Sequence, residues 1–236
     1  MRYSNFYFDE TYILIIIGMV LCLLASAMVK STYAKYEKMR TLSGITGKEA
    51  AELILRREGI YDVSVEHVHG KLSDHYDPRS KVVRLSDSTY SSASVAAVGV
   101  AAHECGHALQ HAKGYVPLQL RSTLVPVANI GSKIAWPLIL IGFFIQSSSS
   151  NLFIQLGIIA FTAAVLFQVV TLPVEFNASS RAMGILKNEG ILQSGELKYA
   201  KKVLNAAALT YVAAAAASML QLLRIILLAK GRRRND

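Results

Sequence analysis

The chain is poor in charged residues and in cysteine. Only 17% of its 236 residues are charged, whereas a soluble domain usually has about 25%. Its two cysteines, Cys22 and Cys105, are too few for a secreted disulfide scaffold. A hydrophobic share of 53% excludes an intrinsically disordered chain. A formal net charge of +9 then leaves two classes, a membrane protein or a compact nucleic-acid binder.

The basic residues lack the arrangement that nucleic-acid binding requires. No patch of the sequence interleaves aromatic with basic side chains, which is the pattern expected of a nucleic-acid interface. Lysines and arginines instead flank the apolar segments, where they suit anionic lipid headgroups. We therefore expect a lipid bilayer as a partner and no nucleic acid.

Four apolar segments are long enough to cross a bilayer. They cover residues 12–29, 122–145, 152–172 and 204–229. The first lacks the basic flank of a signal peptide, because Arg2 is outweighed by Asp9 and Glu10, so we expect an uncleaved anchor. The middle two are joined only by residues 146–151, which predicts an antiparallel hairpin. The last contains Arg224, and is either a fourth span or a helix packed on the protein's own core.

The polar regions between these segments, residues 30–121 and 173–203, lie on one side of the membrane if all four segments cross. Lysine and arginine are concentrated beside the spans on that side, which favours a cytoplasmic location. The basic residues within 230–234 oppose this orientation. The sequence thus divides into an anchor (1–29), a main polar region (30–121), a helical hairpin (122–172), a second polar region (173–203) and a C-terminal segment (204–236).

The main polar region combines helices with short strands. Thr46 and Glu49 form a capping-box pattern that opens a short helix. Strands are predicted over residues 63–67 and 81–85, and a helix over 93–113. The first half of this helix is apolar on all sides, so the helix should be buried. The expected fold class is a mostly α membrane protein, a four-helix transmembrane bundle with a small α+β domain.

The predicted buried helix carries an H-E-x-x-H motif formed by His103, Glu104 and His107. Residues four apart lie on the same face of a helix, so both imidazoles can bind one metal ion. Neutral imidazole suits Zn²⁺, and Glu104 lies where it can take a proton from a metal-activated water. Catalytic zinc has three protein ligands and one open position, so a third ligand is required.

Two residues are candidates for the third ligand. His111 lies one turn beyond His107 but two turns from His103, so it is better placed as a neighbour of the ligands. Glu175 follows the third apolar segment, and Pro173 is suited to the first turn of a new helix. A helix-borne glutamate some tens of residues after H-E-x-x-H is the third ligand of the thermolysin-type arrangement. We therefore expect Glu175 to bind the metal.

Two segments, AAHECGHALQH (101–111) and LPVEFNASSRA (172–182), resemble the YugP-type neutral zinc metallopeptidases of bacteria, which are distantly similar to the HtpX-like gluzincins. The resemblance implies a zincin-like domain on the bundle, Zn²⁺ as cofactor, protein or peptide substrates and a place in the bacterial inner membrane. HtpX-like enzymes usually have an aspartate where this chain has Ser179. Asn177 or Ser179 could then orient a ligand histidine, with His111 as a further neighbour.

The hypothesis is a membrane-associated endopeptidase that hydrolyses peptide bonds through a metal-activated water. Glu104 accepts the proton of this water and passes it to the leaving amine. The oxyanion needs a second electrophile besides zinc, and we expect Arg181 to supply it. The alternatives for this role are His75, Tyr76 and Tyr115.

The substrate is expected to pair with a strand near the motif. Val82, Val83 and Arg84 precede the motif helix, in the place of the edge strand that binds substrate in thermolysin-like enzymes. Main-chain pairing would orient a peptide with little demand on its sequence. Because Glu175 lies three residues beyond an apolar segment, the metal site should be near the membrane surface. We therefore expect substrates that are membrane proteins or their juxtamembrane segments.

One alternative is a non-enzymatic membrane scaffold with a structural metal site, or a degenerate protease. A structural site needs only ligands, so the presence of Glu104 argues against this alternative. Cys105, inside the motif, is expected to be a small buried residue rather than a redox switch. The sequence leaves the oligomeric state open.

Overall fold

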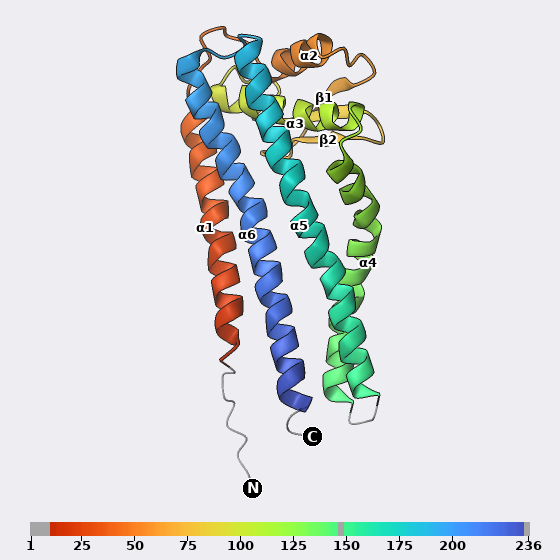
Figure 1. The fold of residues 1–236 in the computed structure, drawn as a ribbon. Helices are drawn as coiled ribbons and strands as arrows, with labels where there is room; N and C mark the ends of the chain where they lie inside the picture. Colours follow the sequence, from red (N-terminus) through yellow and green to blue (C-terminus); the bar gives the residue numbers. More distant parts are fainter. Residues whose placement is uncertain (1–9, 146–148, 234–236) are drawn as a thin grey trace. The chain divides into compact units, whose positions relative to one another are not determined.

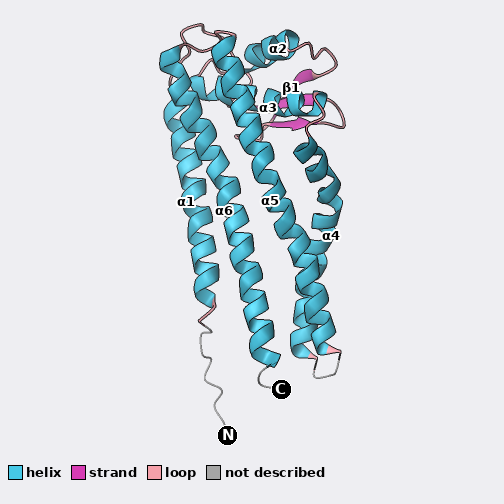
Figure 2. Cartoon of the chain, viewed as in Figure 1, coloured by secondary structure: helices cyan, strands magenta, loops and turns pink. Residues whose placement is uncertain are grey.

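A computed structural model of the chain describes residues 10–145 and 149–233. Within them are six helices and one three-stranded sheet, so the fold is mostly helical as predicted (Figure 1, Figure 2). The elements are α1 (Tyr12–Tyr36), α2 (Gly47–Arg57), β1 (Ser64–Val68), β2 (His75–Asp77), β3 (Val82–Ser86), α3 (Val95–Ala112), α4 (Val116–Phe144), α5 (Ser150–Asn188) and α6 (Ser194–Arg233).

Four of these helices, α1, α4, α5 and α6, are long and apolar enough to cross a membrane. Large apolar side chains such as Leu23, Ile130 and Ile159 are more than half exposed on them. Water would penalise such a surface, whereas lipid tails would not. All four predicted spans are therefore confirmed in length and composition, including the C-terminal one. Part of the predicted hairpin loop, residues 146–148, lies outside the described residues.

The chain divides into two units. One comprises residues 1–24, 123–169 and 212–236, and the other comprises residues 25–122 and 170–211. The first unit contains the apolar parts of the four long helices, which approach one another where one helix has a glycine. These approaches pair Gly18 with Ala217, Gly131 with Ala160, Gly142 with Ile154, and Gly157 with Ile139. Small residues at such contacts let helix backbones come close together, as in membrane bundles.

The second unit is built on the sheet, whose strand order is β1-β3-β2. β1 is parallel and β2 antiparallel to β3. Val83 and Leu85 of β3 are fully buried with Ile54 of α2 and Val98 of α3 in one apolar core. The capping box at the start of α2 is formed as predicted, and the two longer strands and α3 lie close to their predicted bounds.

The strand predicted at the edge of the sheet is its central strand. β3 contains Val82, Val83 and Arg84, and both of its backbone edges are occupied by β1 and β2. These residues therefore have no free edge for a substrate, and that prediction is wrong. The sequence did not indicate β2, because its three residues are too few to show a period.

The helix boundary predicted at Pro173 is also absent. α5 continues through Pro173, so Glu175 lies on the same helix as the preceding apolar segment. A proline removes one hydrogen bond and usually bends a helix. In helices of membrane proteins the freed backbone group can be satisfied by neighbouring helices, so a proline there is compatible with a continuous helix.

α3 and α5 approach each other closely at a glycine inside the H-E-x-x-H motif. A Cβ atom added to Gly106 would lie 2.6 Å from the carbonyl oxygen of Ala178. Real Cβ atoms do not come so close to backbone, so any larger residue would push the two helices apart. Glycine at this position therefore permits the observed distance between α3 and α5.

Replacing Gly106 by alanine should strain both helices or separate them. We expect a loss of about 1–3 kcal/mol in the free energy of unfolding, the usual cost of overpacking, measured as a lower thermal midpoint of the full chain in detergent. Gly184→Ala on α5 is the matched control, since among the described residues no atom outside its own stretch of helix lies within 4 Å of its added Cβ, and it should be neutral or stabilising. Equal stability of the two variants would contradict the close approach.

Candidate metal centre

The structure brings His103, His107 and Glu175 together between α3 and α5. The Nε2 atoms of His103 and His107 lie 3.3 Å and 3.6 Å from Oε2 of Glu175. One possible ligand atom from each residue lies within 4.8 Å of the other two. The imidazole rings are arranged edge to face, with centroids 4.7 Å apart. These are the three residues that the sequence predicts as ligands.

The carboxylate of Glu175 is in an environment that suits a cation. Glu175 is only 2% exposed, and its Oε2 makes no hydrogen bond within the part of the chain that the structure describes. A buried carboxylate oxygen without a partner is costly. This oxygen faces two imidazole nitrogens, and a metal ion between the three atoms would satisfy it. Two imidazoles and one carboxylate are also the donor set of catalytic zinc with an open fourth position.

The local charges also favour a cation. Burial lowers the pKa of His107, but its interaction with Glu175 and the negative charges of Glu104 and Glu175 outweigh burial, so the pKa is raised overall. The two carboxylates thus attract positive charge to the point where the imidazoles meet. A divalent cation bound there would gain from the same field.

Each candidate ligand histidine has a partner for its other ring nitrogen. Nδ1 of His107 lies 3.0 Å from Oε1 of Gln110, and Nδ1 of His103 lies 3.1 Å from Oγ of Ser179. If each Nδ1–H donates to these oxygens, each Nε2 keeps its lone pair for a metal. Of the two residues predicted to orient a ligand histidine, Ser179 therefore contacts one. Asn177 contacts Gln110 instead of a ligand histidine.

Gln110 is a residue of the site that the sequence analysis missed. Its side chain is fully buried, and Nε2 donates to the carbonyl oxygen of Val174 at 2.8 Å and to Oδ1 of Asn177 at 3.0 Å. Its amide is thus fixed by α5 while Oε1 accepts from His107 on α3. The sequence does contain a signal for Gln110: it lies three positions after His107 on a buried helix, and residues at this spacing share a helix face.

Two further side chains that were not predicted reach Glu175. Nη1 of Arg121, in the second turn of α4, lies 3.6 Å from Oε1 of Glu175. The phenol of Tyr211 on α6 interacts with the same carboxylate and is affected by the charge of Glu104. Both residues are distant from the motif in sequence, and no spacing rule connects them with it. Only the tertiary structure indicates their place.

Arg181, predicted to stabilise the oxyanion, is tied to other groups. Its Nε donates to Oδ1 of Asn177 at 2.7 Å, and its guanidinium carbon lies 5.9 Å from the ring centroid of Tyr115. A chain of side-chain hydrogen bonds therefore runs from Arg181 through Asn177 and Gln110 to His107. The structure places Arg181 at the far end of this chain from the metal ligands.

The other residues singled out in the sequence lie outside the ligand cluster. Nδ1 of His111 lies 2.8 Å from the hydroxyl of Tyr76 on β2. Nδ1 of His75 lies 2.8 Å from the carbonyl oxygen of Ser73. Cys105 is buried against α2, with Sγ 3.7 Å from the carbonyl oxygen of Ala51. Burial raises the pKa of its thiol, which disfavours the reactive thiolate and fits a small buried residue.

The buried amide contact to His107 should contribute to metal affinity. Replacing Gln110 by alanine should weaken zinc binding by roughly 10- to 100-fold, the usual effect of removing a partner that orients a ligand, measured by competition with a chelating dye. His111→Ala is the control, because His111 lies on the same helix and contacts Tyr76 instead of the cluster. Equal affinities of the two variants would exclude the role assigned to Gln110.

Comparison with known proteins shows the family to which the chain belongs. Residues 11–230 match the model of a family described as "Putative neutral zinc metallopeptidase". The chain is 51% identical over 204 residues to a protein of Bacillus subtilis (strain 168) named "Putative membrane protease YugP", an alignment that covers 86% of this chain and 89% of that protein. No solved structure matches the chain. By this family match and this identity, the chain belongs to the neutral zinc metallopeptidase family.

Proposed function

We propose that the protein is a zinc-dependent endopeptidase of the membrane that hydrolyses peptide bonds of proteins at or near the membrane surface. The observation that carries the proposal is the buried Oε2 of Glu175, which faces Nε2 of both His103 and His107 and makes no hydrogen bond among the described residues. These three residues bind the zinc ion. Family membership and the named relative support a protease.

The chemistry divides between the metal and Glu104. When bound, Zn²⁺ supplies a Lewis acid that acidifies a water molecule and polarises the scissile carbonyl. Glu104 is adjacent to the ligand His103 and is only 8% exposed, so its carboxylate acts in a medium of low dielectric constant. It accepts the proton of the attacking water and returns it to the leaving amine.

The side chains around Glu175 have two different roles in this proposal. Arg121 contacts Oε1 of Glu175 and leaves Oε2 facing the imidazoles, so it positions the ligand. Tyr211 is near both Glu104 and Glu175, and its hydroxyl is the donor that we assign to the oxyanion. Arg181 acts through Asn177 and Gln110 on the orientation of His107.

The substrate backbone pairs with β2 in this proposal. β2 is an edge strand among the described residues, since only β3 pairs with it. It also packs against α3, and the contact between Tyr76 and His111 joins the two elements. An extended peptide added to this edge would run beside the motif helix, held by main-chain hydrogen bonds that tolerate many sequences.

The expected site of action follows from α5. One continuous helix carries both the apolar segment and Glu175. At a rise of about 1.5 Å per residue, Glu175 is within one helical turn of the apolar segment that ends at Leu172. Substrate segments close to the bilayer would therefore be favoured. We place this side of the membrane in the cytoplasm, because lysines and arginines are concentrated beside the spans on it, although the basic residues within 230–234 oppose this orientation.

Replacing Glu104 by glutamine should remove the base without removing the metal. We expect a fall of at least about 100-fold in the cleavage rate of casein or a detergent-solubilised membrane protein, with unchanged zinc content. Glu52→Gln is the control, because Glu52 is a half-exposed residue on α2 that pairs with Lys48. If the wild type binds zinc but shows no cleavage that depends on Glu104, the result would support the non-enzymatic scaffold instead.

Attaching a substrate to the bilayer should accelerate its cleavage. In liposomes containing the enzyme, a cleavable segment fused to a transmembrane helix should be cut roughly 100-fold or more faster than the same segment free in solution, because anchoring raises its effective concentration at the site. The identical segment sequence serves as the control. Equal rates for both forms would exclude the preference for membrane substrates.

A further inference from the structure

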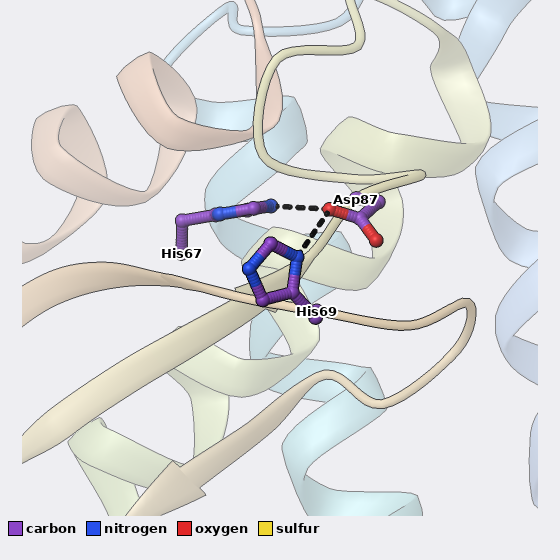
Figure 3. A group of neighbouring side chains, drawn as sticks. All are labelled: His67, His69 and Asp87. Carbon is purple, nitrogen blue, oxygen red and sulfur yellow. Dashed lines mark hydrogen bonds and ion pairs between the residues drawn. The ribbon is translucent and has the colours of Figure 1, made fainter.

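A second group of metal-ligating side chains lies outside the His103 cluster. Nε2 of His67 is 2.6 Å and Nδ1 of His69 is 3.6 Å from Oδ1 of Asp87 (Figure 3). One possible ligand atom from each of the three residues lies within 4.8 Å of the other two. Figure 3 shows both imidazoles converging on the carboxylate. None of these residues has a role in the proposed peptide hydrolysis.

The sheet itself produces this convergence. Side chains two residues apart in a strand lie on the same face. His67 is the last residue but one of β1, and His69 directly follows the strand, so both side chains lie on one side of the sheet. β1 and β3 are parallel, with Val68 beside Ser86 in the register. Asp87, the next residue after β3, is therefore the neighbour of His69.

Local contacts hold two of the three side chains in place. Oδ2 of Asp87 accepts from the backbone N–H of Gly70 at 2.8 Å, which leaves Oδ1 directed at the histidines. The ring of His67 packs against the ring of Tyr90, with centroids 5.2 Å apart. The ring of His69 lies edge to face against the ring of His67, with centroids 5.2 Å apart, and the His69 side chain is 95% exposed. Part of the group is thus held in position before an ion binds, and the group is accessible to ions from solution.

We propose that His67, His69 and Asp87 form a second metal site, for a divalent cation of the late first transition series such as Zn²⁺. Imidazole nitrogen favours such ions over Mg²⁺ and Ca²⁺, which prefer oxygen ligands. Three protein ligands leave the remaining coordination positions to water. The bound ion would link the C-terminal ends of the parallel strands β1 and β3.

This link would stabilise the chain segment that leads to the motif helix. Asp87 begins the connection from β3 to α3, and the next residue, Ser88, accepts a hydrogen bond through its carbonyl oxygen from the hydroxyl of Tyr33. A ligand that binds only the folded state raises its stability in proportion to the logarithm of ligand concentration. Zinc beyond the first equivalent should therefore raise the thermal midpoint of the protein.

The test is the metal content of four forms of the full chain, purified in detergent through a tag without histidine and equilibrated with Zn²⁺. We expect about two zinc equivalents in the wild type, about one in His69→Ala, about one in His103→Ala and none in the double variant. His69→Ala changes an exposed side chain and should fold normally. If His103→Ala does not fold, the comparison of His69→Ala with the wild type still decides.

The matched control is Glu66→Gln, which lies on the same strand and pairs with Arg84 on its neighbour. It should keep the zinc content and the zinc-dependent thermal shift of the wild type. Equal zinc content in the wild type and His69→Ala would overturn the second site, whatever the outcome at His103. If His103→Ala loses zinc and His69→Ala does not, the proposed peptidase site would stand and the second metal site would be excluded.

Discussion

The buried carboxylate of Glu175 is the group on which the rest of the site depends. A carboxylate removed from water needs opposite charge and hydrogen-bond partners, and here Oε1 faces Arg121 while Oε2 faces the two imidazoles. That arrangement requires α3 and α5 to lie close together. Gly106 allows this distance, since a side chain there would collide with the backbone of Ala178.

The close approach of α3 and α5 also explains the hydrogen bonds that hold the two candidate ligand histidines. A metal-binding histidine needs a partner at its other nitrogen to fix its tautomer, and both partners depend on α5: Ser179 belongs to it, and Gln110 is held by it. One continuous helix therefore supplies a candidate ligand, one orienting group, the acceptor that holds the other orienting group, and an apolar segment long enough to enter the membrane. This shared helix is the physical basis for proposing that cleavage occurs near the bilayer.

Much of this could be predicted from the sequence, because the signals are local. The four spans follow from the length of apolar runs, the candidate ligand pair from helical spacing, and Glu175 from its position after a span.

The errors of prediction arise where the signal is not local. The strand β2 was not predicted, because three residues are too few to show a period. Since β2 pairs with β3, β3 is the central strand of the sheet instead of the predicted edge strand. Pro173 was misjudged because its local preference for a first turn is overridden in a continuous long helix. Arg121 and Tyr211 reach Glu175 only through tertiary packing, which no spacing in the chain encodes.

The central claim is that one zinc ion is bound by His103, His107 and Glu175. Anomalous diffraction at the zinc absorption edge from crystals of the full chain tests it most directly. The account predicts an anomalous peak about 2.0–2.2 Å from Nε2 of both histidines and from a carboxylate oxygen of Glu175. A zinc-loaded crystal without a peak at this position, or with the peak on other residues only, would contradict it.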